Sequence, residues 1–518
     1  MRSTRDRSVR RSRRRRCDGR AGPRIRTRGV PLHARAGGLA PAARGSGTVR
    51  ADHGARLIIA SNRGPLRFER RADGKGFTSH LGAGGVATAL GPLLEDAPEG
   101  TIWVASALTD DDRAAVRAGE ARAAHMDLRL LDLDPQTARL HLDVVSNGVL
   151  WFLHHGLFDL ARRPRFDRRF QEAWRGYEDV NRAFADTVCE LASDGDVVLV
   201  QDYQLSLTPG YIRTTRPDLR VVHFTHTPFA GPNAIRVLPW DVATALCGSL
   251  SSVPCGFHAT RWADCFVAAT RQVLGADRAT TAPFVASLGP DIEALTRTAE
   301  SEAARAAARE LDDLVGDRQL VLRIDRIDLS KNLLRGFAAY DLLLEEHREW
   351  RERVVFVAMV NPSRATLPEY RAYRNEVEQA VARVNDRWAT SGWDPVVLDS
   401  RDDFHRSVAG LGRYDVLLVN PLNDGLNLVA KEGPLLNQRD GLVCLSTEAG
   451  AFEELGEAVI PVHPYDLVQT ADALHTALTM PRDERVARAA RLRDLAGART
   501  NRDWLADLVK RAEAATMQ

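Results

Sequence analysis

From residue 55 onward, short apolar runs of strand length alternate with longer runs of helical periodicity. The strings "ARLIIASNRG", "GTIWVASAL", "DVVLVQDY" and "LRVVHFTHTPF" are of the first kind. The last two are β-branched and almost continuously apolar, as expected of strands buried on both faces. Apolar side chains at Trp174, Tyr177, Val180, Phe184 and Val188 recur at steps of three and four, which predicts one face of a helix. Strands that alternate with helices predict an α/β fold with mostly parallel sheets.

The second half of the sequence repeats this pattern. It has strand-like runs in "RQLVLRIDRID", "RVVFVAMV", "YDVLLVNPL" and "DGLVCLSTEAG", and helical runs in "LLRGFAAYDLLLEEHREW" and "LNLVAKEGPLL". A chain of 518 residues exceeds a single core, and the strands suffice for two sheets. We therefore predict Rossmann-like domains at 55–290 and 291–481, with a central cleft at the carboxyl ends of their strands. Residues 482–518 are predicted to be helical throughout and able to pack back on the first domain.

The charge of the chain is unevenly distributed. The net charge of +2 combines an arginine-rich extension, residues 1–54, with 16 arginines and three aspartates, and a remainder with 55 basic and 66 acidic groups. The extension lacks apolar periodicity and is predicted to be disordered, because it cannot bury enough surface to offset ordering. A basic arm for nucleic acid or an anionic surface is the alternative; an upstream start codon would also explain it. The acidic remainder argues against a nucleic-acid-binding body.

Cysteine usage and hydropathy bear on the compartment. The six cysteines are scattered without a C-x-x-C pair, which favours reduced thiols in a cytoplasmic protein. No run of about 18 apolar residues predicts a membrane span. The acidic strings "TDDD" at 109–112 and "DLD" at 132–134 follow no long apolar strand, so we interpret them as solvated loops, and we predict no metal site and no cofactor.

Polar residues follow several predicted strands of the first half. Arg63 follows the first strand, and the glycines of "LGAGGV", including Gly85, precede a helical run where backbone N–H groups could meet an anion or form a plain turn. Asp202 could hold a sugar hydroxyl or cap a helix. His223 and His226 point to opposite faces of a strand, so they make a poor metal pair. We place His223 in the core and His226 at the cleft.

Lysine is rare in this chain, which has four lysines among 71 basic residues. One of them, Lys331, lies with Arg326 in "RIDRIDLSKN" at the end of a second-half strand. A compact ammonium and a guanidinium at this edge suit a departing diphosphate. The alternative is a salt-bridged turn with Asp325 and Asp328.

The string "NPLNDGLNLVAKEG" follows another strand of the second half. Glu432 lies eight residues, about two helical turns, after Asp424, which stands in the loop. A carboxylate on that helix could hold a ribose diol, while Asp424 and the loop amides lie near a reacting sugar. Lys431 points elsewhere on the helix and is predicted to be structural.

Nine strings occur in the order typical of one family. They are "SNRGP", "GAGGV", "SNGVLW", "VQDYQL", "HTPF…IRVLP", "RIDRIDLSK", "NPSR", "LNDGLNLVAKE" and "AGAFEELG", between about residues 56 and 470. The chain thereby resembles the trehalose-6-phosphate synthase family, retaining glucosyltransferases with the two-domain GT-B fold.

The resemblance implies roles for the matching residues. Acceptor-binding positions are Arg63 and Arg364, which would hold the phosphate of glucose 6-phosphate, and Trp151, which would line the acceptor pocket. Donor-binding positions are Gly85, Asp202, His226, Arg326, Lys331, Asp424, Leu428 and Glu432. Among these, Arg326, Lys331, His226 and Asp424 are the implied catalytic residues.

The implied reaction moves glucose from UDP- or GDP-glucose to the anomeric hydroxyl of glucose 6-phosphate with retention. It is usually drawn as front-face attack in which the leaving phosphate accepts the acceptor's proton, so catalysis rests on positioning and charge stabilisation. The expected partners are thus a nucleotide sugar and a sugar phosphate, with no nucleic acid or membrane. Whether the chain forms a homo-oligomer stays open.

Several positions depart from the family pattern. Gln201 and Gln204 replace two histidines, Ser106 a tryptophan, Leu142 a tyrosine, Asn423 an arginine and Asn332 a glycine. These changes leave two alternatives open. One is a transferase or pseudo-glycosyltransferase that makes another phosphorylated disaccharide or pseudo-disaccharide, and the other is a non-catalytic sugar-phosphate sensor.

Overall fold

The computed structural model describes residues 55–82, 86, 90, 98–276 and 282–515, so the predicted disorder of residues 1–54 lies outside them. A seven-stranded sheet fills the first half, in the order β5-β4-β1-β6-β7-β8-β9, and all its neighbouring strands are parallel. Its strands are β1 (Leu57–Ser61), β4 (Ile102–Ser106), β5 (Asp127–Leu131), β6 (Val197–Gln201), β7 (Arg220–Thr225), β8 (Cys255–Phe257) and β9 (Phe284–Val285). The parallel sheet predicted for this half is confirmed.

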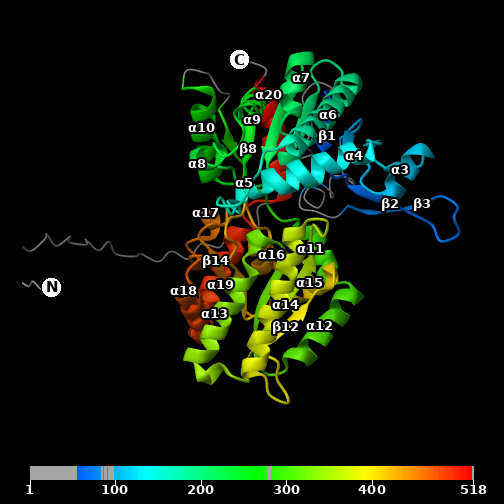
Figure 1. Cartoon of the computed structure of the whole chain (residues 1–518). Coiled ribbons are helices and arrows are strands. Elements are labelled where there is room, and N and C mark those ends of the chain that lie inside the picture. Colours follow the sequence, from blue (N-terminus) through cyan, green and yellow to red (C-terminus); the bar gives the residue numbers. More distant parts are fainter. Residues whose placement is uncertain (1–54, 83–85, 87–89, 91–97, 277–281, 516–518) are drawn as a thin grey trace, which may run out of the picture. The chain divides into compact units, whose positions relative to one another are not determined.

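Alternation along these strands sends side chains to two apolar layers. Ile58 and Ala60 join one layer with Val180 and Phe184 of helix α6, on the face of the helix that the sequence predicts. The helical segments of this half are α3 (Asp110–Arg117), α4 (Pro135–Arg139), η2 (Leu140–Leu150), α5 (Trp151–His155), α6 (Arg168–Leu191), η3 (Tyr203–Leu205), α7 (Thr208–Thr215), α8 (Pro232–Ile235), α9 (Trp240–Leu250) and α10 (Thr260–Leu274). Figure 1 shows these elements in cyan to green.

A six-stranded parallel sheet forms the second half, in the order β12-β11-β10-β13-β14-β15. Its strands are β10 (Gln319–Ile327), β11 (Val354–Pro362), β12 (Val396–Asp399), β13 (Val416–Val419), β14 (Leu442–Ser446) and β15 (Ile460–Val462). Its helices are α11 (Ile292–Ala299), α12 (Glu302–Val315), η4 (Leu329–Lys331), α13 (Leu333–Glu346), η5 (Arg348–Trp350), α14 (Pro368–Trp388), α15 (Phe404–Arg413), α16 (Val429–Leu436), α17 (Phe452–Leu455) and α18 (Leu467–Thr479).

The first strand of each sheet occupies its topological switch point. β1 lies between β4 and β6, and β10 lies between β11 and β13, so the chain winds outward in both directions from each. Ligands of open α/β sheets bind outside the carboxyl ends of strands at such points. Arg63 follows β1, and Arg326 is the second-last residue of β10.

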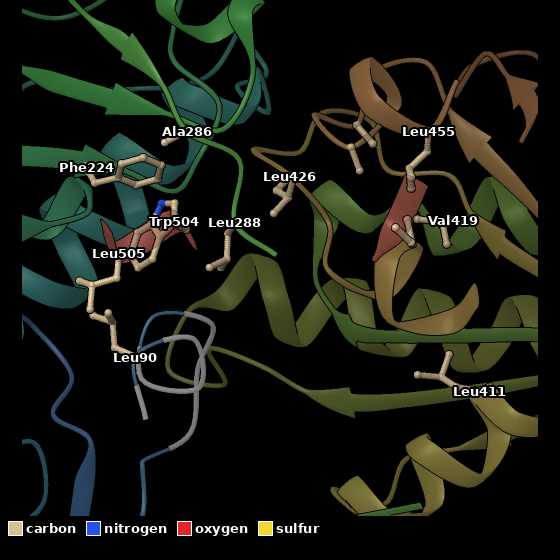
Figure 2. Packing of buried hydrophobic residues seen from close by; sticks show 14 of the residues in the cluster. Leu90, Phe224, Ala286, Leu288, Leu411, Val419, Leu426, Leu455, Trp504 and Leu505 are labelled. Atoms are coloured by element: carbon tan, nitrogen blue, oxygen red, sulfur yellow. The ribbon is translucent and has the colours of Figure 1, made fainter. Parts of the chain in front are cut away.

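The sequence predicts that the carboxyl-terminal segment is helical throughout. The structure instead divides it into two helices. Helix α19 (Arg482–Ala496) ends before Gly497, and α20 (Asn501–Ala514) restarts from a capping box in which Thr500 and Asp503 each accept the other's backbone N–H. Helix α19 contacts α16 and β14, whereas α20 contacts β6 and β7 of the first sheet. Figure 2 shows Trp504 of α20 beside Phe224 of β7, with 5.2 Å between their ring centroids. The domain boundaries themselves stay a prediction.

The acidic string at 109–112 begins a helix and is not a solvated loop, whereas residues 132–134 do form a loop in which Asp132 and Asp134 are exposed, as predicted. Thr109 and Asp112 form the capping box of α3, and buried Asp112 also accepts the backbone N–H of Phe68. Phe68 belongs to the antiparallel hairpin of β2 (Leu66–Arg70) and β3 (Phe77–Leu81), which the sequence pattern did not predict. Asp134, at the end of the second string, is the N-cap of α4 and accepts the backbone N–H of Thr137. Within the described residues, no helix is long and apolar enough to cross a membrane.

Candidate active site

Six candidate residues lie at or just beyond the carboxyl ends of parallel strands. Arg63, Asp202 and His226 follow β1, β6 and β7, while Arg326, Arg364 and Asp424 lie at or after the ends of β10, β11 and β13. Since parallel strands end at a common edge, each sheet gathers its own candidates. Contacts of Arg364 and of the loop around Asp424 then join the two sets.

Arg364 links the two halves of the described chain. Its Nε donates to Asn147 Oδ1 at 3.1 Å, and its guanidinium stacks over the Trp151 ring, 3.8 Å from the ring centroid. On the second-half side it forms an ion pair with Asp328 and donates to Tyr370 Oη at 3.1 Å. Burial would lower the pKa of Arg364, but the neighbouring Asp328 carboxylate outweighs burial and raises the pKa, so the group is permanently charged. Its φ of +45° shows that these contacts hold a strained backbone.

From the sequence we considered Asp328 only as a possible salt-bridge partner. In the structure it binds several side chains of the site. It is fully buried and accepts Ser330 N–H, Ser330 Oγ–H and Tyr370 Oη–H at 3.1 Å each. Burial opposes its ionisation, but Arg364 and Arg326 outweigh burial and lower its pKa to about 2. The repeated aspartate in "RIDRID" was the sequence signal that could have drawn attention to Asp328. Nothing in the sequence pointed to Arg364 as the partner of Asp328.

Two further guanidinium groups lie near this ion pair. The Arg326 guanidinium lies over the Trp151 ring, 5.8 Å from the ring centroid. Burial, together with the charges of Arg326 and Arg364, lowers the pKa of Arg63. Neither Arg63 nor Arg326 forms an ion pair with any residue that the structure describes. Trp151 Nε1 is also buried without a partner among these residues. The guanidinium groups of Arg63, Arg326 and Arg364 thus outnumber Asp328, the carboxylate that pairs with one of them among the described residues.

Lys331 lies in a row of alternating charges. Its Nζ is 2.6 Å from Asp424 Oδ2 and 3.8 Å from Asp325 Oδ1. Burial would lower the pKa of Lys331, but the two carboxylates outweigh it and raise the pKa. Arg323, fully buried, binds Asp325 through Nε and the Lys331 carbonyl oxygen through its guanidinium. Of the salt-bridged turn considered from the sequence, only the Lys331–Asp325 pair is present among the described residues, because Asp328 pairs with Arg364. Asp325 and Asp424 fix the ammonium at the end of β10.

The residue after Lys331 explains one departure from the family pattern. Asn332 has a φ of +60°, in the left-handed region that glycine occupies without strain and asparagine tolerates. Its Nδ2 donates to the carbonyl oxygens of Asn420 and Pro464 at 3.0 and 2.7 Å. The turn keeps its shape with an added pair of hydrogen bonds.

On the first sheet, Asp202 accepts the backbone N–H of His226 at 3.1 Å. Asp202 has a φ of +69° and makes no side-chain cap bond to η3, so the helix-cap alternative is not what the structure shows. Burial raises its pKa to about 6. The His226 ring contacts Gln201 and His258, and His223 is fully buried as predicted.

The α16 helix carries the remaining donor candidates. Leu428 accepts the backbone N–H groups of Lys431 and Glu432 through its carbonyl oxygen, both at 2.8 Å. Burial raises the pKa of Glu432 to about 7, and its carboxylate has no hydrogen bond to the described residues. Lys431 is fully buried and binds Ser287 Oγ, Leu288 O and Glu454, which agrees with a structural role. Gly85 lies outside the described residues.

The loop after Asp424 approaches the first half closely. A Cβ on Gly425 would lie 1.9 Å from the His226 carbonyl oxygen, so only glycine fits there. Trp262 Nε1 donates to the Gly425 carbonyl oxygen at 3.0 Å. Asn423 Nδ2 donates to His154 O at 3.4 Å, and its Oδ1 is buried without a partner among the described residues. These contacts bring Asp424 and Lys331 to the His226 side of the site.

A group of possible metal ligands lies elsewhere, at His347, Glu349 and His475. The two imidazole rings are stacked with centroids 3.6 Å apart. Trp350 Nε1 donates to His475 Nδ1 at 3.1 Å, so the neutral His475 ring carries its proton on Nε2 and offers no free lone pair. As arranged, the group does not fit a metal ion.

Comparison with known proteins identifies the family. The sequence profile of glycosyltransferase family 20 matches residues 55–514. The trehalose-6-phosphate synthase of Mycobacterium avium is 32% identical over 472 residues, which cover 87% of this chain and 94% of that protein. The chain belongs to glycosyltransferase family 20.

Other members of glycosyltransferase family 20 give the same picture. A bifunctional trehalose-6-phosphate synthase/phosphatase of Thermoproteus tenax is 31% identical over 476 residues, or 88% of this chain. This chain spans only 63% of that protein's length. The solved E. coli structure described as trehalose-6-phosphate bound with UDP-2-fluoro glucose superposes with a TM-score of 0.74 and 26% identity, covering 88% of this chain and 99% of that one. The GT-B fold expected from the resemblance is confirmed.

Four departures from the glycosyltransferase family 20 pattern, at residues 106, 142, 201 and 204, lie in the first half of the chain. Ser106 is buried at the end of β4, where its Oγ donates to Asn62 Oδ1 at 3.2 Å. Leu142 lies half-buried in η2, a π-helix that leads into Trp151. The carbonyl oxygen of Gln204 accepts from His141 and Asn181, so that segment is held by its backbone. Ser106 is thus smaller than the tryptophan usual in the family, and Leu142 lacks the hydroxyl of the usual tyrosine.

Proposed function

We propose that this chain transfers glucose from a nucleotide sugar, UDP- or GDP-glucose, to glucose 6-phosphate with retention, giving trehalose 6-phosphate and a nucleoside diphosphate. The observation that carries the proposal is a cluster of three guanidinium groups. Arg326 and Arg364 lie over the Trp151 ring, and burial together with the charges of these two arginines lowers the pKa of Arg63. Of the three, only Arg364 has a carboxylate partner among the described residues. Arginine clusters of this kind recognise phosphate oxygens. Similar solved structures add support, because the synthase of Burkholderia vietnamiensis is described as UDP-forming and the E. coli structure as bound with UDP-2-fluoro glucose.

The proposed mechanism assigns charge stabilisation to the second sheet. Arg326 and Lys331 would neutralise the leaving diphosphate, and Lys331 would exchange its 2.6 Å contact with Asp424 for a phosphate oxygen. Asp424, once released, could accept a hydroxyl of the donor glucose. Glu432 would hold the ribose hydroxyls, while Asp202 and His226 would border the donor sugar from the first sheet.

The acceptor would lie near the first sheet. Arg63 would bind the phosphate of glucose 6-phosphate, with Trp151 as the wall of the pocket. Arg364 would contribute a guanidinium that Asp328 and Tyr370 already hold in place. Its side chain therefore loses little conformational entropy when the acceptor binds. The leaving diphosphate would take the proton of the attacking hydroxyl, since no carboxylate is assigned as nucleophile or base.

Purified full-length protein incubated with UDP-glucose or GDP-glucose and glucose 6-phosphate tests this function. We expect release of nucleoside diphosphate that depends on the acceptor, and trehalose 6-phosphate as the product. Absence of diphosphate release with every donor and acceptor would refute the transferase and favour the sugar-phosphate sensor. We further propose a cytoplasmic, metal-independent enzyme, and activity unchanged by a chelator would support the second point.

A second candidate is transfer to a different phosphorylated acceptor. Ser106 and Leu142 stand where the family usually has tryptophan and tyrosine, and this favours an acceptor of other shape or polarity. An acceptor panel of hexose and amino-cyclitol phosphates decides between the two. Glucose 6-phosphate as the best substrate by kcat/KM would refute the second candidate.

A further inference from the structure

Both ring nitrogens of His226 are occupied by other side chains. Nε2 lies 2.9 Å from Gln201 Oε1, and Nδ1 lies 3.1 Å from Nε2 of His258. The second nitrogen of His258, Nδ1, accepts the backbone N–H of Leu288 at 3.4 Å. Gln201 and His258 are both buried, so bulk water does not compete for these contacts. Four residues from β6, β7, β8 and the segment after β9 therefore form one hydrogen-bonded chain.

The backbone amide fixes the direction of this chain. A peptide N–H can only donate, so His258 Nδ1 must accept, and the neutral His258 ring carries its proton on Nε2. That proton is donated to His226 Nδ1, which places the His226 proton on Nε2. Gln201 must then present its carbonyl oxygen, because its NH₂ group would oppose another N–H. A reversal of the whole chain would bring two donors together at Leu288, and turning the Gln201 amide alone would bring two donors together at Gln201.

The surroundings favour neutral rings. Burial, together with His258 and His223, holds the pKa of His226 well below its ordinary value. Burial and the nearby Lys431 ammonium lower the pKa of His258 to about 3. Trp504 packs its ring 5.6 Å from the His226 ring, and the Asp202 carboxylate binds the His226 backbone N–H and not its ring. The Gln201 Nε2 atom has no partner among the described residues, so His226 alone orients this amide.

We propose that Gln201 is a positioning residue that holds His226 as a neutral, Nε2-protonated imidazole. In this state the ring has no lone pair and no proton free for a substrate. His226 would therefore act on the donor sugar by contact and orientation and would not serve as the proton acceptor of the transfer step. The inference deepens the proposed function, and only its kinetic test depends on that function.

Nitrogen NMR of the full chain labelled with ¹⁵N-histidine tests the tautomer without any substrate. We expect His226 to show a protonated Nε2 and an unprotonated Nδ1, unchanged between pH 6 and pH 8. His258 should show the same pattern, with signals assigned by their loss in His226→Asn and His258→Asn. A protonated Nδ1 or an imidazolium on His226 in the wild-type protein would overturn the proposal.

The variant Gln201→Met removes the acceptor while keeping side-chain length. We expect its His226 to lose the single Nε2-protonated state, whereas the matched control Gln204→Met, three residues along, should keep it. Gln201→His, which restores the residue usual in the family and an acceptor nitrogen, should also keep it. An unchanged His226 spectrum in a folded Gln201→Met would overturn the proposal.

Kinetics then test whether positioning matters for turnover. Relative to wild type, Gln201→Met should lower kcat about tenfold, the typical effect of one lost hydrogen bond, with KM for the acceptor unchanged. Gln201→His should recover most of kcat. A changed tautomer with kcat within twofold of wild type would overturn the positioning role. Absence of transferase activity in the wild type would instead refute the proposed function and leave the NMR result intact.

Should Gln201→Met fail to fold, His258 offers a second route. His258→Gln keeps an N–H donor for His226 Nδ1 and an acceptor for Leu288, whereas His258→Leu keeps neither. We expect the Nε2-protonated state of His226 in the first variant and its loss in the second. The same spectrum in both folded variants would overturn the proposed chain.

Discussion

The strand edges of the two sheets hold charge in different ways. On the first sheet, the neutral side chains of His258, His226 and Gln201 form one chain of hydrogen bonds. On the second sheet Lys331 lies among Asp325, Asp424 and the buried Arg323, so that each charge has an opposite neighbour. Arg63 and Arg326 are the exceptions, since neither has an ion pair among the described residues.

This difference teaches how a buried cation can await an anion. An isolated buried ammonium would lose its proton or destabilise the fold, but a carboxylate at 2.6 Å keeps Lys331 charged. A diphosphate could then take the place of Asp424 without any change of protonation. The hydrogen-bonded chain of Gln201, His226 and His258 on the first edge needs no such exchange, because these side chains are uncharged whether or not a ligand is bound.

The largest expected effect comes from removing the second-edge ammonium. Lys331→Ala should lower kcat by about 10²–10³-fold, the loss typical of one contact that stabilises transition-state charge. Steady-state kinetics with saturating donor and acceptor measure it, and Lys510→Ala, an exposed lysine on α20, is the control. A kcat within twofold of wild type would show that Lys331 only stabilises the turn.

The next effect concerns pH and Glu432, the one second-edge acid without a cation. Burial raises its pKa in the folded chain to about 7 from an ordinary 4.5, so ionisation costs stability as pH rises from 4.5 to 7. Glu432→Gln removes this cost. Its stability relative to wild type should therefore be higher at pH 8 than at pH 5, by on the order of 2–3 kcal/mol.

Urea unfolding of both proteins at pH 5 and pH 8 measures that difference. Glu376→Gln, at an exposed position of α14, should show the same relative stability at both pH values. If Glu432→Gln behaves like this control, the Glu432 carboxylate is better solvated than its burial indicates.

A smaller effect tests the unpaired cation of the first edge. Arg63→Ala should raise KM for the sugar phosphate roughly 10–100-fold, as expected for one hydrogen bond to a charged group, with little change in KM for the donor. Arg67→Ala, an exposed arginine on β2, is the control. An equal rise in both KM values would mean that Arg63 supports the whole site and does not bind the acceptor phosphate.

The smallest effect concerns the turn after Lys331. Asn332→Gly relieves the positive φ but loses the bonds to Asn420 O and Pro464 O, so we expect a net loss of stability of about 1 kcal/mol. Asn332→Ala, which keeps the strain and loses the bonds, should lose more. Equal stability of wild type and Asn332→Gly in thermal unfolding would show that the two bonds only offset the strain.

The strand ends could be predicted from sequence because apolar runs and the polar residues after them are local features. Arg63, Arg326 and Asp424 were all placed at carboxyl ends of strands in this way. The partners of these residues could not be predicted. Asp328 meets Arg364 only because β10 and β11 are neighbours, and His258 meets His226 only because β8 pairs with β7.

Local breaks were also hard to predict. The helical pattern of the last segment hid the stop at Gly497, because the capping box at Thr500 interrupts a run whose composition stays helical. The string at 109–112 was predicted to be a loop because it follows no long apolar strand, but short side chains with carboxylates equally suit the start of a helix. The same prediction holds for residues 132–134, which form an exposed loop.

Helix α20 has a consequence for how the chain matures on the ribosome. The face of the first sheet that carries Phe224 is made early, yet its cover, Trp504, is synthesised only after every strand of the second sheet. Until then that apolar face must stay sheltered by other means, and a nascent chain that stalls before α20 would present it to chaperones or to its neighbours.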